Sequence, residues 1–340
     1  MCATLLLLLS VASATPVAAQ YVPIELVTLP QGTSNVVRAV NDGGEVAAAT
    51  SGRAVLLTRT GLQLFQDPAA TDYSVALGIN AAGETVGFFN TTSAVRAFRG
   101  LRTAGIVPLT PLVGDSASQA FAINAAGQAV GFSSGPAGVR AVLWSRSGTV
   151  QELPVLLPAG AATRALAIND AGDVVGVSDA PNGARAVRWQ GGVVQDLGAL
   201  PGHSTSQAVA INRKGEIAGS SGDADGPRRA VLWMADGTIR DLGTLPGGTR
   251  SRALGISDRT EVVGSSDTGH GTHAFRWTAG SGMQDLNDLL TSRTGFVLTE
   301  AVASSPQGVI VALGEDDDGG ADAHGHDERP IRVFLLVPTP

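Results

Sequence analysis

The chain has 340 residues, of which 44% are hydrophobic, 4% aromatic and 16% charged. This hydrophobic content excludes a disordered chain, and the low aromatic content means that the core is built mainly from aliphatic residues. The net charge of −7 gives no electrostatic reason to expect nucleic acid, whose binding needs a basic face. We therefore expect a folded protein without a nucleic-acid partner.

Residues 1–19 have the features of a secretory signal peptide. Leu5 to Leu9 form an apolar run too short to span a bilayer as a mature helix, and small residues follow it up to Ala19. We expect cleavage after Ala19 and a secreted or periplasmic protein with no membrane insertion. The segment departs from the pattern because no Lys or Arg precedes the apolar run, and a buried N-terminal helix is the alternative. Cys2, the single cysteine, lies in this segment, so no disulfide or Cys-ligated metal is expected in residues 20–340.

Residues 20–340 read as seven copies of one unit within a single domain. The best copies contain Ala-x-Ala-Ile-Asn-x-x-Gly, as in Ala165–Gly172. The aligned turn positions lie 39 to 48 residues apart along the chain, at Gly44, Gly83, Gly127, Gly172, Gly215, Thr260 and Gly308. This spacing fits the four-stranded blade of a propeller and is too long for one coil of a β-helix. The sequence therefore predicts an all-β fold, a seven-bladed β-propeller; six or eight blades would require a misreading of the weak first or last copy.

Each unit is expected to contain four strands, the first of them innermost. Side chains alternate along a strand, so Ala165 and Ala167 are expected on one side, with Leu166 and Ile168 on the other. Small residues there would let neighbouring sheets approach near the axis. The Asn-x-x-Gly sequence predicts a tight hairpin to the second strand. The third strand begins with Arg in most copies and ends in the four tryptophans of the chain, which are expected to pack between sheets: Trp144, Trp189, Trp233 and Trp277.

The seventh unit lacks a fourth strand of its own. The segment 25–32 matches the fourth-strand segment 241–248 at five of eight positions, with Glu25 in place of Asp241. We therefore expect the N-terminal segment to add itself to the last blade and close the ring, which leaves no free end blade.

Three motifs together indicate a family. They are Ala-Ile-Asn-x-x-Gly-x-x-Val-Gly, Asp-Leu-Gly-Thr-Leu-Pro-Gly-Gly, and the tripeptide His273-Ala274-Phe275. Together they resemble the HAF family of bacterial extracellular repeat proteins over nearly the whole of residues 20–340. The chain departs from the pattern in the first and seventh units, where Ala48 and Ala312 replace a second-strand glycine. The resemblance implies secretion and a repetitive β-structure, and it assigns no catalytic residue.

The long acidic loop of the seventh unit, residues 315–328, is a candidate metal site. Clustered carboxylates with glycines suit Ca²⁺, and the candidate ligands are Asp316, Asp317, Asp318 and Asp322. A Zn²⁺ site formed by His324 and His326 with Asp322 or Asp327 is a weaker possibility, because a His-x-His pair in a Gly-rich loop is poorly specific. The alternative is a solvated acidic loop without metal, and no cofactor is otherwise expected.

Two recurring polar positions are candidates for ligand contacts or for structural bonds. The arginines at the start of the third strand could form an anion-binding collar, but we favour pairing with acids of the fourth strand: Arg53, Arg96, Arg140, Arg185, Arg229 and Arg332. The turn asparagines are expected to be structural.

The sequence contains neither a nucleophile elbow nor a His-Glu-x-x-His zinc motif. We therefore expect a monomeric, non-catalytic binding module for an extracellular protein or carbohydrate ligand. The alternative is an extracellular polysaccharide hydrolase or lyase acting at the axial funnel, since paired carboxylates can lie far apart in sequence. An enzyme would break the symmetry of the innermost strand ends, and the repeated asparagines there favour the binding module.

Overall fold

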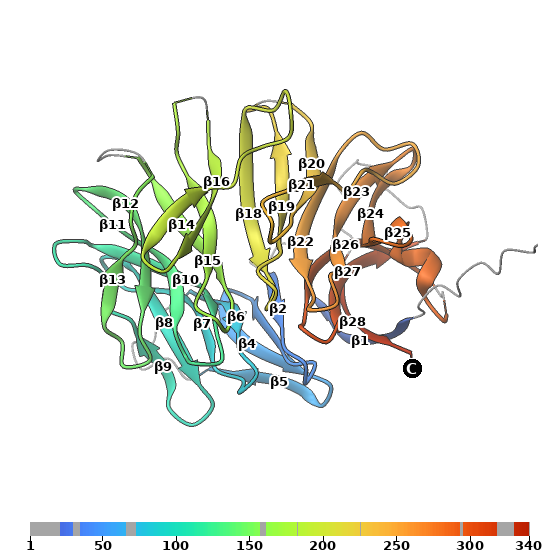
Figure 1. Ribbon diagram of the computed structural model, residues 1–340. Coiled ribbons are helices and arrows are strands. Elements are labelled where there is room, and N and C mark those ends of the chain that lie inside the picture. The colour runs from blue at the N-terminus through green and yellow to red at the C-terminus, as the bar shows by residue number, and fades with distance from the viewer. Residues whose placement is uncertain are drawn as a thin grey trace, which may run out of the picture.

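The computed structural model describes residues 21–29, 35–65, 73–156, 161–181, 183–224, 226–292, 295–317 and 330–339. Residues 1–19 lie outside this part of the chain, so the signal peptide stays a prediction. Within it, twenty-eight strands form seven antiparallel sheets of four strands, which confirms the seven-bladed β-propeller. Figure 1 shows the sheets, here called blades, following one another around the molecule in chain order.

The blades comprise the following strands. Blade one has β2 (Val36–Val40), β3 (Val46–Thr50), β4 (Arg53–Thr58) and β5 (Gly61–Leu64), and blade two has β6 (Ser74–Ile79), β7 (Thr85–Asn90), β8 (Val95–Leu101) and β9 (Gly105–Pro108). Blade three has β10 (Ala117–Ile123), β11 (Ala129–Gly135), β12 (Gly138–Trp144) and β13 (Val150–Glu152), and blade four has β14 (Thr163–Ile168), β15 (Val174–Ser178), β16 (Arg185–Gln190) and β17 (Val193–Asp196). Blade five has β18 (Thr205–Ile211), β19 (Ile217–Gly222), β20 (Arg228–Trp233) and β21 (Ile239–Asp241), and blade six has β22 (Ser251–Ile256), β23 (Val262–Thr268), β24 (Gly271–Thr278) and β25 (Gly282–Asp285). Blade seven has β26 (Phe296–Ser304), β27 (Ile310–Asp316), β28 (Ile331–Pro338) and β1 (Tyr21–Leu29), and a short 3₁₀ helix, η1 (Leu286–Leu289), precedes it.

Blade seven is completed by the N-terminal strand, as the sequence predicts. Strand β1 pairs antiparallel with β28, and the two lie side by side in Figure 1. The Arg332 guanidinium donates to the Glu25 carboxylate at 2.5 Å. The corresponding pair in blade four joins Arg185 to Asp196. Glu25 therefore takes the place of the fourth-strand aspartate, and both ends of the described chain are held in one sheet.

The four tryptophans are buried between adjacent blades, which confirms their predicted role. Trp189 of blade four is 3% exposed and belongs to a cluster with Val130 and Ala141 of blade three. Its indole Nε1–H donates to the Pro154 carbonyl at 2.7 Å, so burial leaves this donor paired. Each large ring therefore fills the space between two sheets at the same position of the repeat.

The expectation of strict alternation in the innermost strand is wrong, because each of these strands contains a β-bulge. In blade four, Ala165 pairs with Gly176 and Ala167 with Val175, and Leu166 is left out of the register. Ala165 and Ile168 consequently share one interblade cluster, whereas Ala167 packs against the cluster of the next blade. The small residues still permit close packing, but they lie on both sides of the strand. An extra residue changes the face of every residue after it.

Tyr21, the first described residue, anchors β1 in the core. It is 1% exposed and packs with Val263 of blade six and Phe334 of blade seven. Burial, reinforced by the negative charge of Glu261, raises the pKa of Tyr21 to about 12. The folded state therefore favours the protonated, neutral phenol.

Replacing Trp189 with Ala should lower the free energy of unfolding by about 3–5 kcal/mol, the usual cost of removing a large core aromatic. Replacing Val193, which is 67% exposed on β17 of the same blade, should change it by less than about 0.5 kcal/mol. Urea denaturation of both Ala variants measures the difference, and a similar small loss in both would contradict interblade packing by Trp189.

Stability should fall at alkaline pH through ionisation of Tyr21. Its pKa is higher in the folded state than the ordinary value of 10.0, so its contribution is complete below pH 10 and is lost as pH rises through about 12. The loss should reach about 2–3 kcal/mol and should be absent in Tyr21→Phe. Urea denaturation at increasing pH tests this, with Tyr73→Phe as the control; equal alkaline loss in wild type and Tyr21→Phe would contradict it.

Candidate functional site

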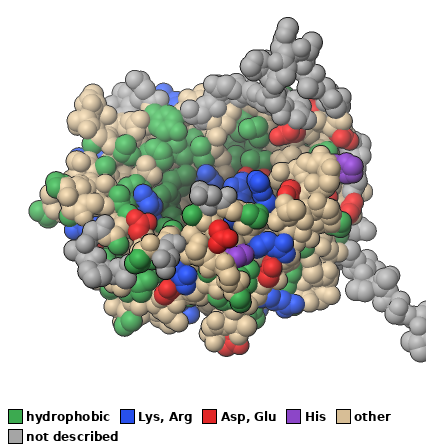
Figure 2. Space-filling model, turned by 90° about the horizontal axis from the view of Figure 1, so that it is seen from above, with side chains coloured by type: hydrophobic (Ala, Val, Ile, Leu, Met, Phe, Trp, Pro, Cys, Tyr) green, Lys and Arg blue, Asp and Glu red, His purple; other side chains and the backbone are tan. Residues whose placement is uncertain are grey.

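A cavity of about 690 Å³ runs along the propeller axis and is lined by the innermost strands of all seven blades: β2, β6, β10, β14, β18, β22 and β26. Its lining extends from Val36, Tyr73 and Gln119 near the strand starts to the hairpins that follow the strands. We call the hairpin side the turn end. In Figure 2, hydrophobic side chains gather in a hollow on the face shown, with Lys and Arg side chains beside it.

The residues left out by the bulges form one ring around this cavity. Every innermost strand leaves out the residue three positions before its turn Asn or Ser, and each of these residues lines the cavity. We call this ring the bulge belt; its members are Arg38, Leu77, Phe121, Leu166, Val209, Leu254 and Val302. Six members are apolar and one is cationic. The belt is therefore an apolar collar with a single charge.

One side of the cavity is aromatic. Tyr73 and Phe88 of blade two line it, with ring centroids 6.0 Å apart. Phe121 of blade three also lines it and lies 5.8 Å from the Phe132 ring. The second-strand positions equivalent to Phe88 and Phe132 are serines in blades five and six, Ser220 and Ser265. The repeat therefore departs from its symmetry at this second-strand position, which contributes Phe88 to the cavity wall.

At the turn end, the asparagines tie each blade to the next. The Asn169 side chain donates to the Asn212 carbonyl at 3.1 Å, and its Oδ1 accepts from the Asp173 backbone N–H at 3.0 Å. Asn41, Asn80, Asn124 and Asn212 make the equivalent bonds to the following blade. These buried side chains are structural, as the sequence predicts, and they connect blades one to six in series.

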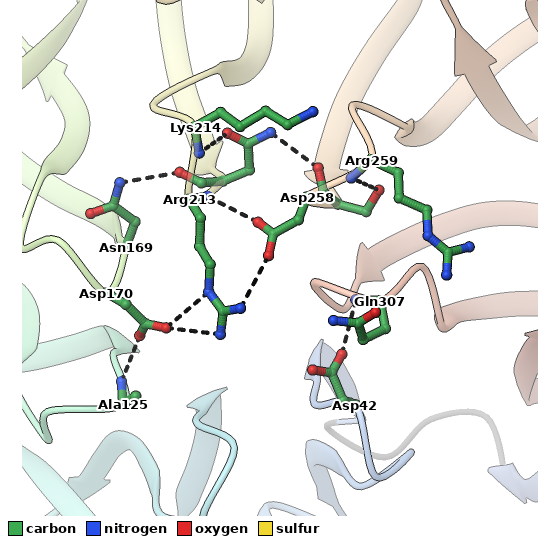
Figure 3. A network of polar contacts seen from close by, with 11 residues as sticks. Asp42, Ala125, Asn169, Asp170, Arg213, Lys214, Asp258, Arg259 and Gln307 are labelled. Carbon is green, nitrogen blue, oxygen red and sulfur yellow. Dashed lines mark hydrogen bonds and ion pairs between the residues drawn. The ribbon is translucent and has the colours of Figure 1, made fainter.

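The position after the turn Asn or Ser is polar in some blades and apolar in others, and it breaks the symmetry at the turn end. Arg213 lies between Asp170 and Asp258, at 3.2 Å and 3.6 Å from their carboxylates (Figure 3). Asp170 also accepts the Ala125 backbone N–H, and Asp258 accepts that of Arg213. Asp42 accepts the Gln307 N–H and so joins blade seven to blade one. The charges at this end are thus largely used in bonds between blades.

A second contact of this network involves a strained backbone. Thr260 stands where the other copies have glycine, and its φ of 65° lies in the left-handed region. Its hydroxyl donates to Glu216 at 2.7 Å and is contacted by Lys214 Nζ at 3.0 Å (Lys214 is labelled in Figure 3). Hydrogen bonds to blade five therefore hold this unfavourable conformation.

Two of the predicted metal ligands, Asp316 and Asp317, are in the described chain, and neither lines the axial cavity. The Asp316 carboxylate ends β27 and pairs with Arg332 at 3.0 Å. The Asp317 backbone N–H donates to the Gly295 carbonyl at 3.2 Å. Asp318, Asp322, His324, His326 and Asp327 lie outside the described residues. Among the described residues, no group of three or more His, Cys, Asp or Glu is placed to hold a metal ion. The calcium and zinc sites stay predictions.

The third-strand arginines mostly pair with acids, as the sequence analysis favours over an anion collar. Arg140, Arg185, Arg229 and Arg332 pair with the fourth-strand residues Glu152, Asp196, Asp241 and Glu25. His273 of blade six occupies the same position and lies 2.6 Å from Asp285. Arg96 instead donates to the Ser116 carbonyl, and Arg53 is exposed. These positions are structural pairs on the blade surfaces.

Sequence reasoning missed the bulge belt and the groups around Arg213. The repeated asparagines were interpreted as evidence of symmetry, whereas the next position varies from Asp42 to Ala81, Asp170 and Arg213 among the copies. Aligning the seven copies and comparing them column by column would have revealed both sets, because axial side chains differ where structural ones repeat.

Comparison with solved structures shows the propeller fold. The chain matches virginiamycin B lyase from Staphylococcus aureus with a TM-score of 0.61 and 14% identity, over 94% of this chain and 100% of the lyase chain. It matches YCF48 bound to D1 peptide with a TM-score of 0.54 and 16% identity, over 94% and 96% of the chains. For YCF48 from Cyanidioschyzon merolae the values are 0.51 and 12%, over 91% and 98%. Identities this low establish the fold alone.

No protein-family model matches the chain, and no curated protein matches its sequence. In the part of the chain that the structure describes, no helix has the length and apolar character needed to cross a membrane.

Replacing Asn169 with Ala should lower the free energy of unfolding by about 2–4 kcal/mol, because two buried backbone groups lose their partners. Asn169→Ser should lose less, since Ser257 shows that a hydroxyl accepts the equivalent N–H, from Glu261 at 3.3 Å. Asn90→Ala, at an exposed strand end, is the control. Urea denaturation measures all three, and an Asn169→Ala loss no larger than that of Asn90→Ala would contradict the interblade role.

Proposed function

We propose that this protein is a secreted β-propeller of the HAF type that binds a ligand in its axial cavity and does not transform it. The cavity volume of about 690 Å³ lies within the range of about 300–1,000 Å³ typical of small-molecule sites. Its wall is mainly apolar with a few polar groups, which is the usual composition of such sites. An oligosaccharide unit, a peptide side chain or a small apolar molecule would fit this description.

The observation that carries the proposal is the position of the residues unique to single copies. Structural residues repeat around the ring, as the turn asparagines and interblade tryptophans do. Arg38, Tyr73 and Phe121 each occur in a single copy of the repeat and line the cavity. Phe88, which recurs in blade three as Phe132, lies beside Tyr73. The asymmetry of the single-copy residues supports a ligand that has a preferred orientation around the axis.

The state of the axial carboxylates supports binding over catalysis. A glycosidase needs two carboxyl groups free to exchange protons with the sugar or to attack it. Asp170 and Asp258 each accept a backbone N–H and share Arg213 between them. Virginiamycin B lyase shares the propeller fold, but identity at this level transfers no catalytic residue. An extracellular polysaccharide hydrolase or lyase is therefore the less supported alternative.

Filling the cavity should abolish binding. The test is a calorimetric titration of wild type, Leu166→Trp and Val193→Trp. The panel contains neutral apolar molecules, charged amphiphiles, oligosaccharides and short peptides. Leu166 belongs to the bulge belt, whereas Val193 is exposed on the outermost strand of the same blade. Any compound that binds wild type should lose about tenfold or more in affinity with Leu166→Trp and keep its affinity with Val193→Trp.

Melting temperatures of the two variants control for folding, and Val209→Trp gives a second filled cavity on blade five. Unchanged affinity in both filled variants would place the ligand elsewhere and contradict the proposal. Mass spectrometry of each bound compound after incubation should return it intact, and a product formed by the wild type would contradict the non-catalytic assignment.

A further inference from the structure

The bulge belt contains one charge, on Arg38. Its six other members are Leu77, Phe121, Leu166, Val209, Leu254 and Val302, contributed by the six other blades. Arg38 is exposed to the cavity. Because the bulge turns the equivalent residue of every blade toward the axis, an aliphatic side chain would fit equally well here. The charge is therefore specific to the first copy of the repeat.

Arg38 forms no ion pair with any acid of the described chain, in contrast to the other arginine that lines the cavity. Arg213 is held between Asp170 and Asp258 at the turn end. The cavity has a third acid, Asp42, which is also at the turn end and accepts the Gln307 N–H. At the level of the belt, the positive charge of Arg38 therefore faces an apolar wall that contains no acid among the described lining residues.

We propose that the axial cavity takes an amphiphilic anion, a molecule with an apolar body and one carboxylate or similar anionic group that pairs with Arg38. This rests on the proposed function, whose site it uses. A guanidinium offers two parallel N–H donors that match a carboxylate, and an ion pair beside apolar walls is screened less than one in open water. The belt then contacts the apolar body, and Phe121 and Tyr73 add aromatic surface.

The acids at the turn end set the orientation of the ligand. Among the turn-end residues that line the cavity, the acids Asp42, Asp170 and Asp258 outnumber the one cation, Arg213. The lining at this end therefore disfavours a second anion. The anionic group consequently stays beside Arg38, and the long guanidinium stem lets it remain near water. The positive charge of Arg38 would repel the head group of a cationic amphiphile at the belt. The cavity thus distinguishes head groups on apolar bodies of the same size.

The test uses three probes with the same ten-carbon chain: decanoate, decyl alcohol and decyltrimethylammonium. Calorimetric titration of the full-length protein, below the micelle concentration, should show one decanoate site per chain. Decanoate should bind about tenfold or more tightly than the other two, and the preference should shrink as salt is raised. Vesicles of anionic phospholipid form a separate arm, and vesicle binding without decanoate binding would overturn a site for single molecules.

Arg38→Leu should weaken decanoate binding by about tenfold and leave decyl alcohol binding unchanged. Arg38→Lys should retain most of the preference, because the charge is kept. The matched control is Arg59→Leu on the same blade, which removes an exposed arginine that does not line the cavity and should change nothing. Equal melting temperatures of the variants would exclude a folding defect as the cause.

The outcomes separate this inference from the proposed function. One outcome is that all three probes bind with equal affinity, lose binding in Leu166→Trp and keep it in Arg38→Leu. In that case the cavity binds ligands and the anion preference is wrong. If none of the probes binds at millimolar concentration, the proposal of an amphiphilic ligand is wrong. The titration of the wider panel against the filled-cavity variants then tests the proposed function by itself. Decanoate binding that survives Leu166→Trp would contradict both.

Discussion

In every blade, the residue three positions before the turn Asn or Ser is left out of pairing with the second strand, and the position of the axial side chains depends on it. The bulge brings the first strand so close to the second that a side chain has no room there: a Cβ at Gly176 would lie 2.0 Å from the Arg164 carbonyl oxygen. The equivalent distances at Gly87 and Gly131 are 1.8 and 1.9 Å. In these blades, the second-strand glycine therefore makes room for the bulge that places a belt residue at the axis. Blades one and seven keep the bulge with Ala48 and Ala312, and nothing in the structure explains how.

The repeat made much of the fold predictable. Seven copies of a strand pattern reinforce one another, so the blade count, the buried tryptophans and the Arg185–Asp196 type of pair could be predicted from one sequence. Closure by β1 was predictable because residues 25–32 match the fourth-strand segment 241–248 at five of eight positions. The faces of the innermost strand were not, because alternation assumes regular pairing and a bulge violates it. Leu166 was consequently assigned to the same side as Ile168, which is buried between blades.

The candidate site was harder to predict for the opposite reason. Residues that repeat in every copy indicate which side chains the packing of a blade requires. They give no information about a side chain that occurs in only one copy. Arg38 stands in a column that is apolar in the six other copies, and Arg213 stands in a column whose residues vary, so neither belongs to a repeated motif. Their importance follows from the geometry of the ring, which brings seven positions separated by whole repeats to a common axis. The acidic loop attracted attention in the sequence because its charges are adjacent, yet its described part, Asp316, serves an ion pair with Arg332.

The pairing of β1 with β28 also constrains the order of events during synthesis. Glu25 and Arg332 are separated by 307 positions in the chain. Strand β1 therefore cannot pair until β28 has been synthesised. Until then, the outer edge that β1 covers in blade seven does not exist, and the hydrophobic cluster around Tyr21 lacks Phe334. Long-range pairing of this kind slows folding. The ring of this protein can therefore close only after strand β28 has been made.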